Sequence, residues 1–94
     1  MEQINRIEIA GTVGYVRRYS VGEGELVRFS VMVDEANNGV EWFTCSATSE
    51  KKGEYSIEKG QHVRVEGRLR RVEYVDQDCN ERSYYEVIVR RVSK

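Results

Sequence analysis

The chain has 94 residues, of which 39% are hydrophobic and 33% are charged, and its formal net charge is −1. This balance excludes a disordered chain and predicts a single soluble domain over residues 1–94 with a modest core. No run of about 18 apolar residues occurs, so we expect no membrane-spanning segment. The start of the chain lacks the basic and then apolar order of an export signal, so we expect a cytoplasmic protein.

The chain has two cysteines and one histidine. Cys45 and Cys79 lack CxxC spacing and histidine-rich surroundings, so we expect free thiols, no metal site and no cofactor. His62 has no nucleophile or carboxylate pair near it in the sequence, which favours a binding protein over an enzyme. Because strands can bring distant residues together, a small enzyme stays an alternative that a turnover assay would test.

Charge is distributed unevenly along the chain. Residues 1–19 carry a net charge of +1, residues 20–62 carry −4 and residues 63–94 carry +2. The basic excess therefore lies at the two ends. This pattern fits a phosphate-bearing ligand and ordinary solvated strand surfaces equally well.

The first predicted strand begins near Ile4 and continues to Tyr19 with alternating apolar and polar residues. Gly11 and Gly14 predict a bulge or sharp bend in it, which a small barrel needs in order to close. The GxxG spacing also occurs in phosphate-clamping loops between helices, but no helix is predicted on either side. A turn follows at residues 21–25.

Two further strands are predicted at residues 26–33 and 40–47, joined by a turn at residues 34–39. Trp42 and Phe43 are neighbours in the second of these strands, so one side chain can pack inward while the other faces out. Residues 48–57 are the one candidate helix, with Ser49 as a possible cap. Gly53 in its middle costs about 1 kcal/mol relative to alanine, so we expect a short turn or two at most.

The last two predicted strands form a long hairpin around a turn at residues 76–81. In the first of them, one face is expected to pack and the other to carry charge. The packed face comprises Val63, Val65, Gly67 and Leu69, and the charged face comprises Arg64, Glu66, Arg68 and Arg70. Arg70 and Arg71 point to opposite faces, and one of the adjacent residues Tyr84 and Tyr85 is expected to face the interior.

This order is strand, strand, strand, a connection with a short helix at most, strand, strand. It predicts an all-β fold, the five-stranded OB-fold, which is a Greek-key barrel that binds oligonucleotides or sugars.

Several segments resemble bacterial single-stranded DNA-binding proteins (SSB), in order and near the family's spacing. Residues 5–14 are similar to the opening of those proteins, and residues 26–33 are similar to their second strand. Glu41 and Trp42 match the start of their third strand. The best match is residues 59–69 together with Glu86-Val87 on the return strand.

The resemblance implies binding of single-stranded DNA without strong sequence preference, in replication, recombination or repair. Trp42 occupies the position of a family stacking tryptophan, and Tyr74 occupies another on the hairpin. Such platforms contribute about 1–3 kcal/mol per stacked base. Without the resemblance, a core position would be the preferred interpretation of Trp42. The expected DNA-binding residues are Trp42, Tyr74, Tyr84, Arg17, Arg18, Arg68 and Arg70.

The chain also departs from the family pattern. Thr48 stands where the family usually has an aromatic residue, and Tyr15-Val16-Arg17 replaces a segment that ends in Asp-Pro-Glu; Tyr19, Tyr84 and Tyr85 are possible substitutes. No acidic tail follows Lys94, so we do not expect tail-mediated recruitment of replication proteins. The alternative is a primosomal accessory OB-fold protein that acts mainly through protein partners.

The resemblance also implies a homo-oligomer, either a tetramer or a dimer. The first strand is a plausible edge for pairing across a two-fold axis, because Ile4, Ile7 and Ile9 are available on its two faces.

Overall fold

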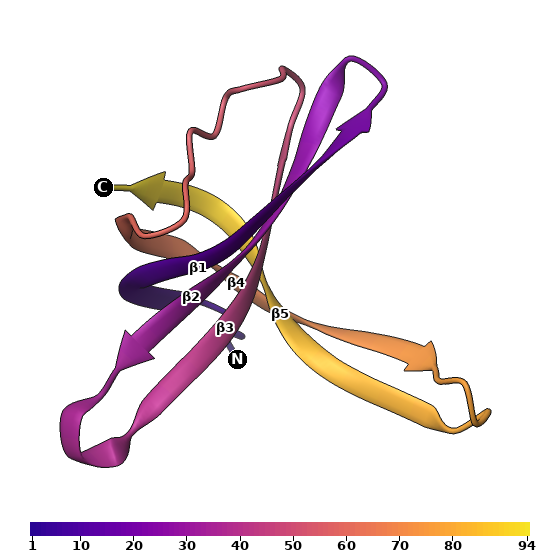
Figure 1. The fold of residues 1–94 in the computed structure, drawn as a ribbon. Helices are drawn as coiled ribbons and strands as arrows, with labels where there is room; N and C mark the ends of the chain where they lie inside the picture. The colour runs from indigo at the N-terminus through magenta and orange to yellow at the C-terminus, as the bar shows by residue number, and fades with distance from the viewer.

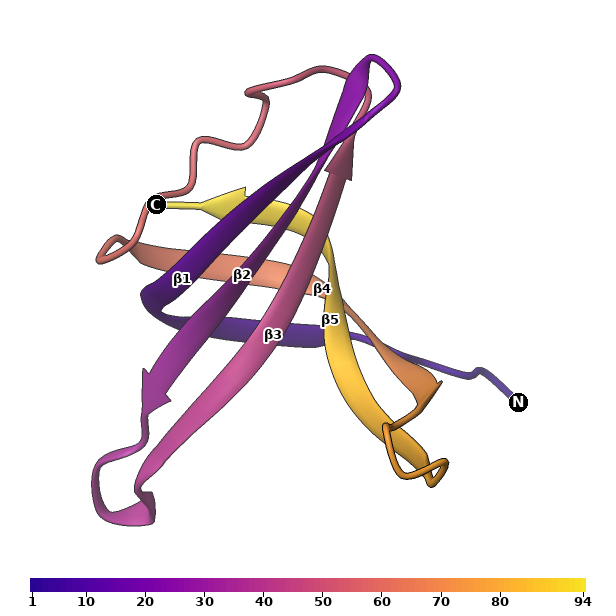
Figure 2. The same ribbon diagram turned by 45° about the vertical axis from the view of Figure 1, so that its right-hand side comes forward.

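The computed structural model describes residues 1–94 and contains five strands closed into a barrel. The strands are β1 (Ile7–Val21), β2 (Gly24–Asp34), β3 (Val40–Ser49), β4 (His62–Val75) and β5 (Glu81–Ser93). They follow the order β1-β2-β3-β5-β4 around the barrel, and β3 and β5 are the one parallel pair. Figures 1 and 2 show this barrel from two sides. The predicted all-β OB-fold is confirmed.

The core consists of the inward-facing residues of every strand. Apolar side chains recur at every second position along a strand, because successive side chains point to opposite faces. In β2, for example, Val27, Phe29 and Val31 are fully buried. The complete buried apolar cluster is Ile9, Val13, Val27, Phe29, Val31, Cys45, Ala47, Ile57, Val63, Val65 and Val87.

Strand β1 pairs with two different strands of the closed barrel and bends between them. Its first half, from Ile7 to Thr12, pairs with β4, and its second half, from Thr12 to Val21, pairs with β2. The register with β2 shifts between Val13 and Val16, which is the bulge that the two glycines predict. The bend allows a single strand to close the barrel.

The connection from β3 to β4 covers one end of the barrel without a helix. Ile57 in this loop is buried in the core, and Tyr55 packs against it. Arg18 holds the loop from outside, since its guanidinium donates hydrogen bonds to the carbonyls of Tyr55 (2.9 Å) and Ile57 (3.2 Å). The one helical segment of the molecule is a 3-10 turn at Ala36–Asn38, between β2 and β3. No helix is long and apolar enough to cross a membrane.

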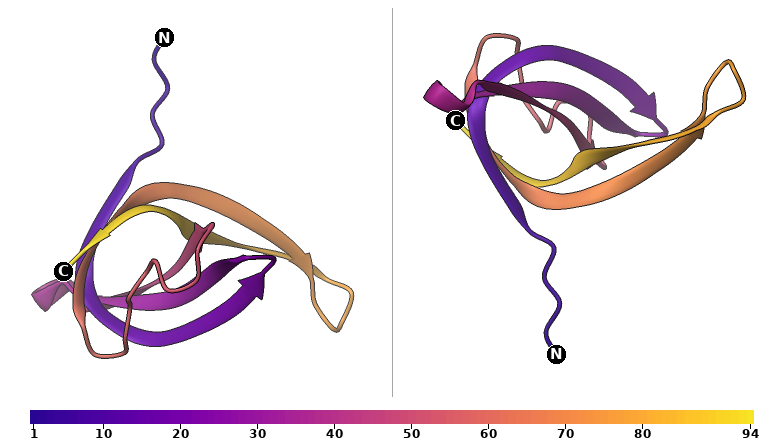
Figure 3. Two further views of the ribbon diagram at one scale, coloured as in Figure 1. Left: turned by 90° about the horizontal axis from the view of Figure 1, so that it is seen from above. Right: turned by 90° about the horizontal axis from the view of Figure 1, so that it is seen from below.

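The β4–β5 hairpin extends beyond the barrel, as Figures 1 and 3 show. Two expectations fail here because this part of the hairpin extends beyond the barrel core. Leu69 was expected on the packed face but is 37% exposed. Neither Tyr84 nor Tyr85 faces the interior; they are 36% and 65% exposed.

Candidate nucleic-acid interface

The outward side chains of β1, β2 and β3, together with those of β5 beside them, form a surface that we call the outer face. Figure 2 shows the first three strands as one twisted sheet. Trp42 lies on this face with 59% of its surface exposed, while Phe43 next to it is half-buried against the core. Trp42 is therefore not a core residue.

The bulge in β1 makes room for the Trp42 ring. A Cβ atom added to Gly14 would lie 2.6 Å from the ring atom Cζ3 of Trp42 and 2.5 Å from the hydroxyl oxygen of Ser30. That hydroxyl accepts a hydrogen bond from the backbone N–H of Tyr15 at 2.9 Å, which fixes the bulge. The ring thus lies directly against the backbone of Gly14, and a side chain at this position would have to displace it.

Two adjoining pockets occupy the outer face. The Trp42 pocket has a volume of about 510 Å³ and is lined by Gly14, Tyr15, Ser30, Trp42, Phe43, Thr44 and Lys59. The arginine pocket has a volume of about 240 Å³ and is lined by Tyr15, Arg17, Tyr19, Arg28, Thr44 and Tyr84. Because Tyr15 and Thr44 line both pockets, the two form one continuous surface of aromatic rings and basic groups.

Glu86 lies beneath this surface with a side chain that is 2% exposed. Its carboxylate accepts hydrogen bonds from Arg28 (2.9 Å) and from Arg70. The same Nη2 atom of Arg28 also lies 3.1 Å from the Tyr84 hydroxyl oxygen. The hydrogen bond to Tyr84 and then the one to Glu86 raise the pKa of Arg28. Two arginines on one carboxylate leave a net positive charge at this point.

The outer face continues onto the hairpin through two tyrosines. The rings of Tyr74 and Tyr84 meet edge to face with centroids 5.9 Å apart, and Tyr74 is 48% exposed. The Asp76 carboxylate braces the hairpin tip, since it accepts hydrogen bonds from Arg82 and from the backbone N–H groups of Asp78 and Asn80. These bonds, that of Arg82 first, lower the pKa of Asp76.

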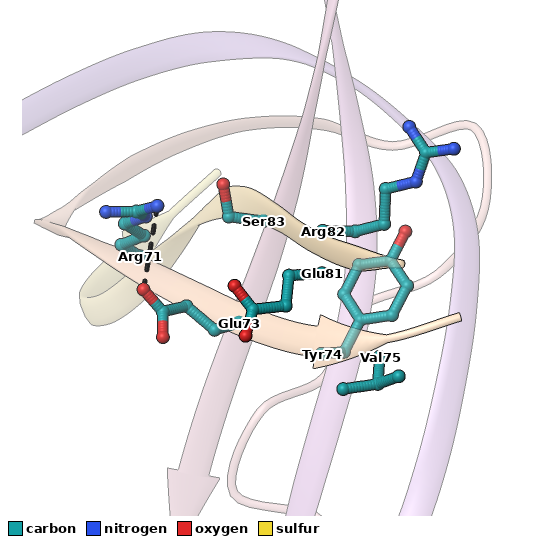
Figure 4. A pocket seen from close by; sticks show the side chains of 7 residues that line it. All are labelled: Arg71, Glu73, Tyr74, Val75, Glu81, Arg82 and Ser83. Atoms are coloured by element: carbon teal, nitrogen blue, oxygen red, sulfur yellow. Dashed lines mark ion pairs between the residues drawn. The ribbon is translucent and has the colours of Figure 1, made fainter. Parts of the chain in front are cut away.

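A third pocket, of about 320 Å³, lies on the hairpin near its tip. Figure 4 shows its lining, with Tyr74 and Arg82 side by side and the ion pair of Arg71 with Glu73 further along. Two acidic and two basic residues line it, so it carries no charge excess. It is less suited to a phosphate than the arginine pocket. The lining residues are Arg71, Glu73, Tyr74, Val75, Glu81, Arg82 and Ser83.

The predicted basic residues fall into different settings. Arg17 is exposed on the outer face, with its guanidinium 5.5 Å from the centroid of the Tyr15 ring. Arg70 lies over Glu86, and Arg68 is exposed two residues away on the same strand face. Arg18 lies elsewhere: it pairs with Glu25 at 2.7 Å and holds the β3–β4 loop. The N–H groups of Arg18 therefore stabilise the fold and are not directed at the outer face.

Sequence reasoning missed Tyr15, Arg28, Lys59 and Glu86 as members of this surface. Period-two alternation in β2 and β5 places Arg28 and Glu86 on outward positions, which is a usable signal. Their meeting depends on the register of β2, β3 and β5, which the sequence pattern does not specify. Tyr15 was noted only as a departure from the family.

The two cysteines are free thiols in different environments. Cys45 is buried in the core, and burial first, then the charge of Glu86, raises its pKa to about 12. Cys79 is exposed at the hairpin tip. No group of three or more histidine, cysteine, aspartate or glutamate side chains is arranged to hold a metal ion.

Comparisons with known proteins agree with this geometry. The chain is similar to the crystal structure of Rim1, the mitochondrial single-stranded DNA-binding protein of S. cerevisiae, with a TM-score of 0.73 and 14% identity over 98% of this chain and 95% of that chain. At this identity the similarity concerns the fold. A comparison with curated protein sequences finds no match.

The family assignment comes from a sequence comparison. The model of the single-strand binding protein family matches residues 4–94, which include every strand of the barrel and both pockets of the outer face. The chain therefore belongs to the single-strand binding protein family.

Proposed function

We propose that this protein binds single-stranded DNA along its outer face, without strong sequence preference and without catalysis, and that it protects the strand in replication, recombination or repair. Bases stack on Trp42, Tyr15, Tyr84 and Tyr74, and basic side chains meet the phosphates. Aromatic rings accept any base, because every base has a flat π-face.

The observation that carries this proposal is the continuity of the two pockets. Exposed aromatic rings and arginines alternate across the outer face, and the one carboxylate that the arginines contact there, that of Glu86, is buried under them. Such a combination of stacking surfaces with a basic track is what sequence-tolerant binding of single strands requires.

A fluorescence titration with dT oligonucleotides of increasing length tests the proposal, because Trp42 is the only tryptophan in the chain. Stacking on a base is expected to quench its emission, and affinity should rise with length until the footprint is filled. Mixed-sequence strands should bind within a few-fold of dT, and duplex DNA should bind much more weakly. Absence of binding to every single strand at low salt would refute the function.

We also propose that the protein works as a dimer or tetramer. Residues 7–11 of β1 pair with β4 along one edge and have no strand along the other, whereas the second half of β1 is paired with β2. An unpaired edge is a template for a strand from a second copy. Light scattering should give a multiple of 10.9 kDa, and a monomer mass at micromolar concentration would contradict it.

A further inference from the structure

Two arginines stand directly opposite each other on the outer face. Arg17 of β1 and Arg28 of β2 are partners in the strand register, and both line the arginine pocket. Like charges at directly opposed positions destabilise a sheet. Glu86 already contacts Arg28, and an anion that contacted both guanidinium groups would offset the remaining repulsion.

The two arginines make different contacts. Arg17 takes part in no ion pair, and its guanidinium lies within cation–π distance of Tyr15. Arg28 is held through one nitrogen, Nη2, by Glu86 and Tyr84, while its side chain stays 34% exposed. A guanidinium has five N–H donors in a rigid fork, so most donors of both arginines remain free.

Glu86 explains the orientation of Arg28. Burial of a carboxylate is costly unless it is paired, and Glu86 is paired twice, with Arg28 and with Arg70. The strand register brings Arg70 directly beside Glu86 on β5, so the carboxylate is fixed from one side and holds Arg28 from the other. Arg28 is thereby kept on the pocket side of the outer face.

We propose that the arginine pocket binds one phosphate of the DNA strand between Arg17 and Arg28, and that Glu86 is a positioning residue that orients Arg28 for this contact. This inference rests on the proposed function and deepens it. The pocket of about 240 Å³ also has the rings of Tyr15, Tyr19 and Tyr84 in its walls, so a base attached to that phosphate finds a stacking partner nearby.

The salt dependence of binding tests whether one phosphate is shared. The log–log slope for single strands is about −0.7 per phosphate neutralised. The Arg17→Ala and Arg28→Ala variants should each lose less than this amount, since the other arginine still meets the phosphate. The double variant should lose about 0.7 in total. A loss of about 1.4 would show two separate phosphates, and an unchanged slope would show none; either result overturns the proposal.

The matched control is Arg91→Ala, which removes the same charge from an exposed arginine outside both pockets. It should leave the slope within error of the parent protein.

Glu86→Gln separates positioning from the general field of the protein. This variant loses one negative charge, so if only the overall charge of the protein mattered, it would bind DNA more tightly. If Glu86 positions Arg28, the variant should bind more weakly and lose the same slope as Arg28→Ala. The control Glu23→Gln loses the same charge at an exposed residue in the β1–β2 turn and should bind slightly more tightly. Tighter binding by Glu86→Gln would overturn the positioning role.

Arg28→Lys covers the case in which Glu86→Gln does not fold. Lysine keeps the charge but lacks the fork that can contact Glu86, Tyr84 and a phosphate together. It should bind more weakly than the parent at unchanged melting temperature, and parental affinity would contradict the proposal. If the parent protein itself binds no single strand, the proposed function fails; if it binds and these variants match it, only the phosphate site fails.

Discussion

The barrel and the projecting β4–β5 hairpin place side chains of one strand face in different surroundings. In the barrel part of β4, Val63 and Val65 are fully buried. Further along, Leu69 and Val75 continue the same face, yet they are 37% and 65% exposed. Alternation identifies which side chains share a face. Burial also requires a second layer of side chains opposite that face, and a single chain provides no such layer for the projecting part of the hairpin.

The largest expected difference between the two regions concerns stability. Phe29→Ala removes a fully buried ring from the barrel and should cost about 3–5 kcal/mol of unfolding free energy. Tyr85→Ala on the hairpin should stay within about 0.5 kcal/mol, because the ring is exposed. Urea denaturation measures both. A cost for Tyr85→Ala that approaches that of Phe29→Ala would show that a second copy covers the hairpin.

The next effect concerns binding and compares the outer face with the opposite face of the hairpin. Trp42→Ala and Tyr74→Ala should each weaken dT binding by about 1–3 kcal/mol if each ring stacks on one base. That loss corresponds to roughly 5- to 150-fold in affinity. Tyr85→Ala, on the opposite hairpin face from Tyr74, is the matched control and should bind normally. Anisotropy of a labelled oligonucleotide provides the readout, and a large fall in melting temperature for Trp42→Ala would contradict its surface role.

A smaller effect separates the neighbours Arg17 and Arg18. Arg18→Ala removes the ion pair with Glu25 and the anchor of the β3–β4 loop. It should cost about 1 kcal/mol of stability, after allowance for solvent screening of a partly exposed pair, and should leave the salt slope unchanged. Arg17→Ala should leave the stability nearly unchanged and should reduce the salt slope. Thermal melting measures the stability of both variants, and a salt titration measures the slope of their DNA affinity. A changed slope for Arg18→Ala would show that Arg18 contacts the DNA.

The smallest effect near neutral pH concerns the thiols. At pH 8 a thiol reagent should modify Cys79 and leave Cys45 unmodified, because burial raises the pKa of Cys45 to about 12. A thiol in the unfolded chain ionises near pH 8.5. The native state therefore keeps its full stability below about pH 8.5 and loses part of it as the pH rises towards 12. Equal reaction of both thiols at pH 8 would show that the core opens.

The barrel could be predicted from the sequence because its signals are local. Alternation predicted the strands, and Gly11 and Gly14 predicted the bend in the first strand. Gly53 correctly indicated that residues 48–57 do not form a long helix. The burial predicted for Leu69 was wrong, because burial depends on which side chains lie opposite in the folded structure, and the local pattern does not contain this information.

The candidate surface could be predicted only in part, since it depends on strand register. The resemblance indicated Trp42, which is exposed, and the distribution of basic residues indicated Arg17, which lines a pocket. Neither signal identified Arg28 and Glu86, which are 58 residues apart and meet only in the folded barrel. Arg17 and Arg18 were predicted together as binding residues, although adjacent strand residues point to opposite faces. Arg17 lies opposite Arg28 on the outer face, whereas Arg18 lies opposite the buried Val27 and holds the β3–β4 loop.

The central claim is that single-stranded DNA lies on the outer face of the barrel. A titration of the isotope-labelled protein with a dT oligonucleotide, followed by ¹H–¹⁵N correlation spectra, tests it most directly, because the single Trp42 indole N–H gives an unambiguous signal. We predict large shifts for this signal and for the amides of Gly14, Tyr15, Thr44 and Tyr84, with little change at Arg64 and Arg91. Shifts concentrated at Arg64 and Arg91, with an unmoved Trp42 indole, would contradict the account.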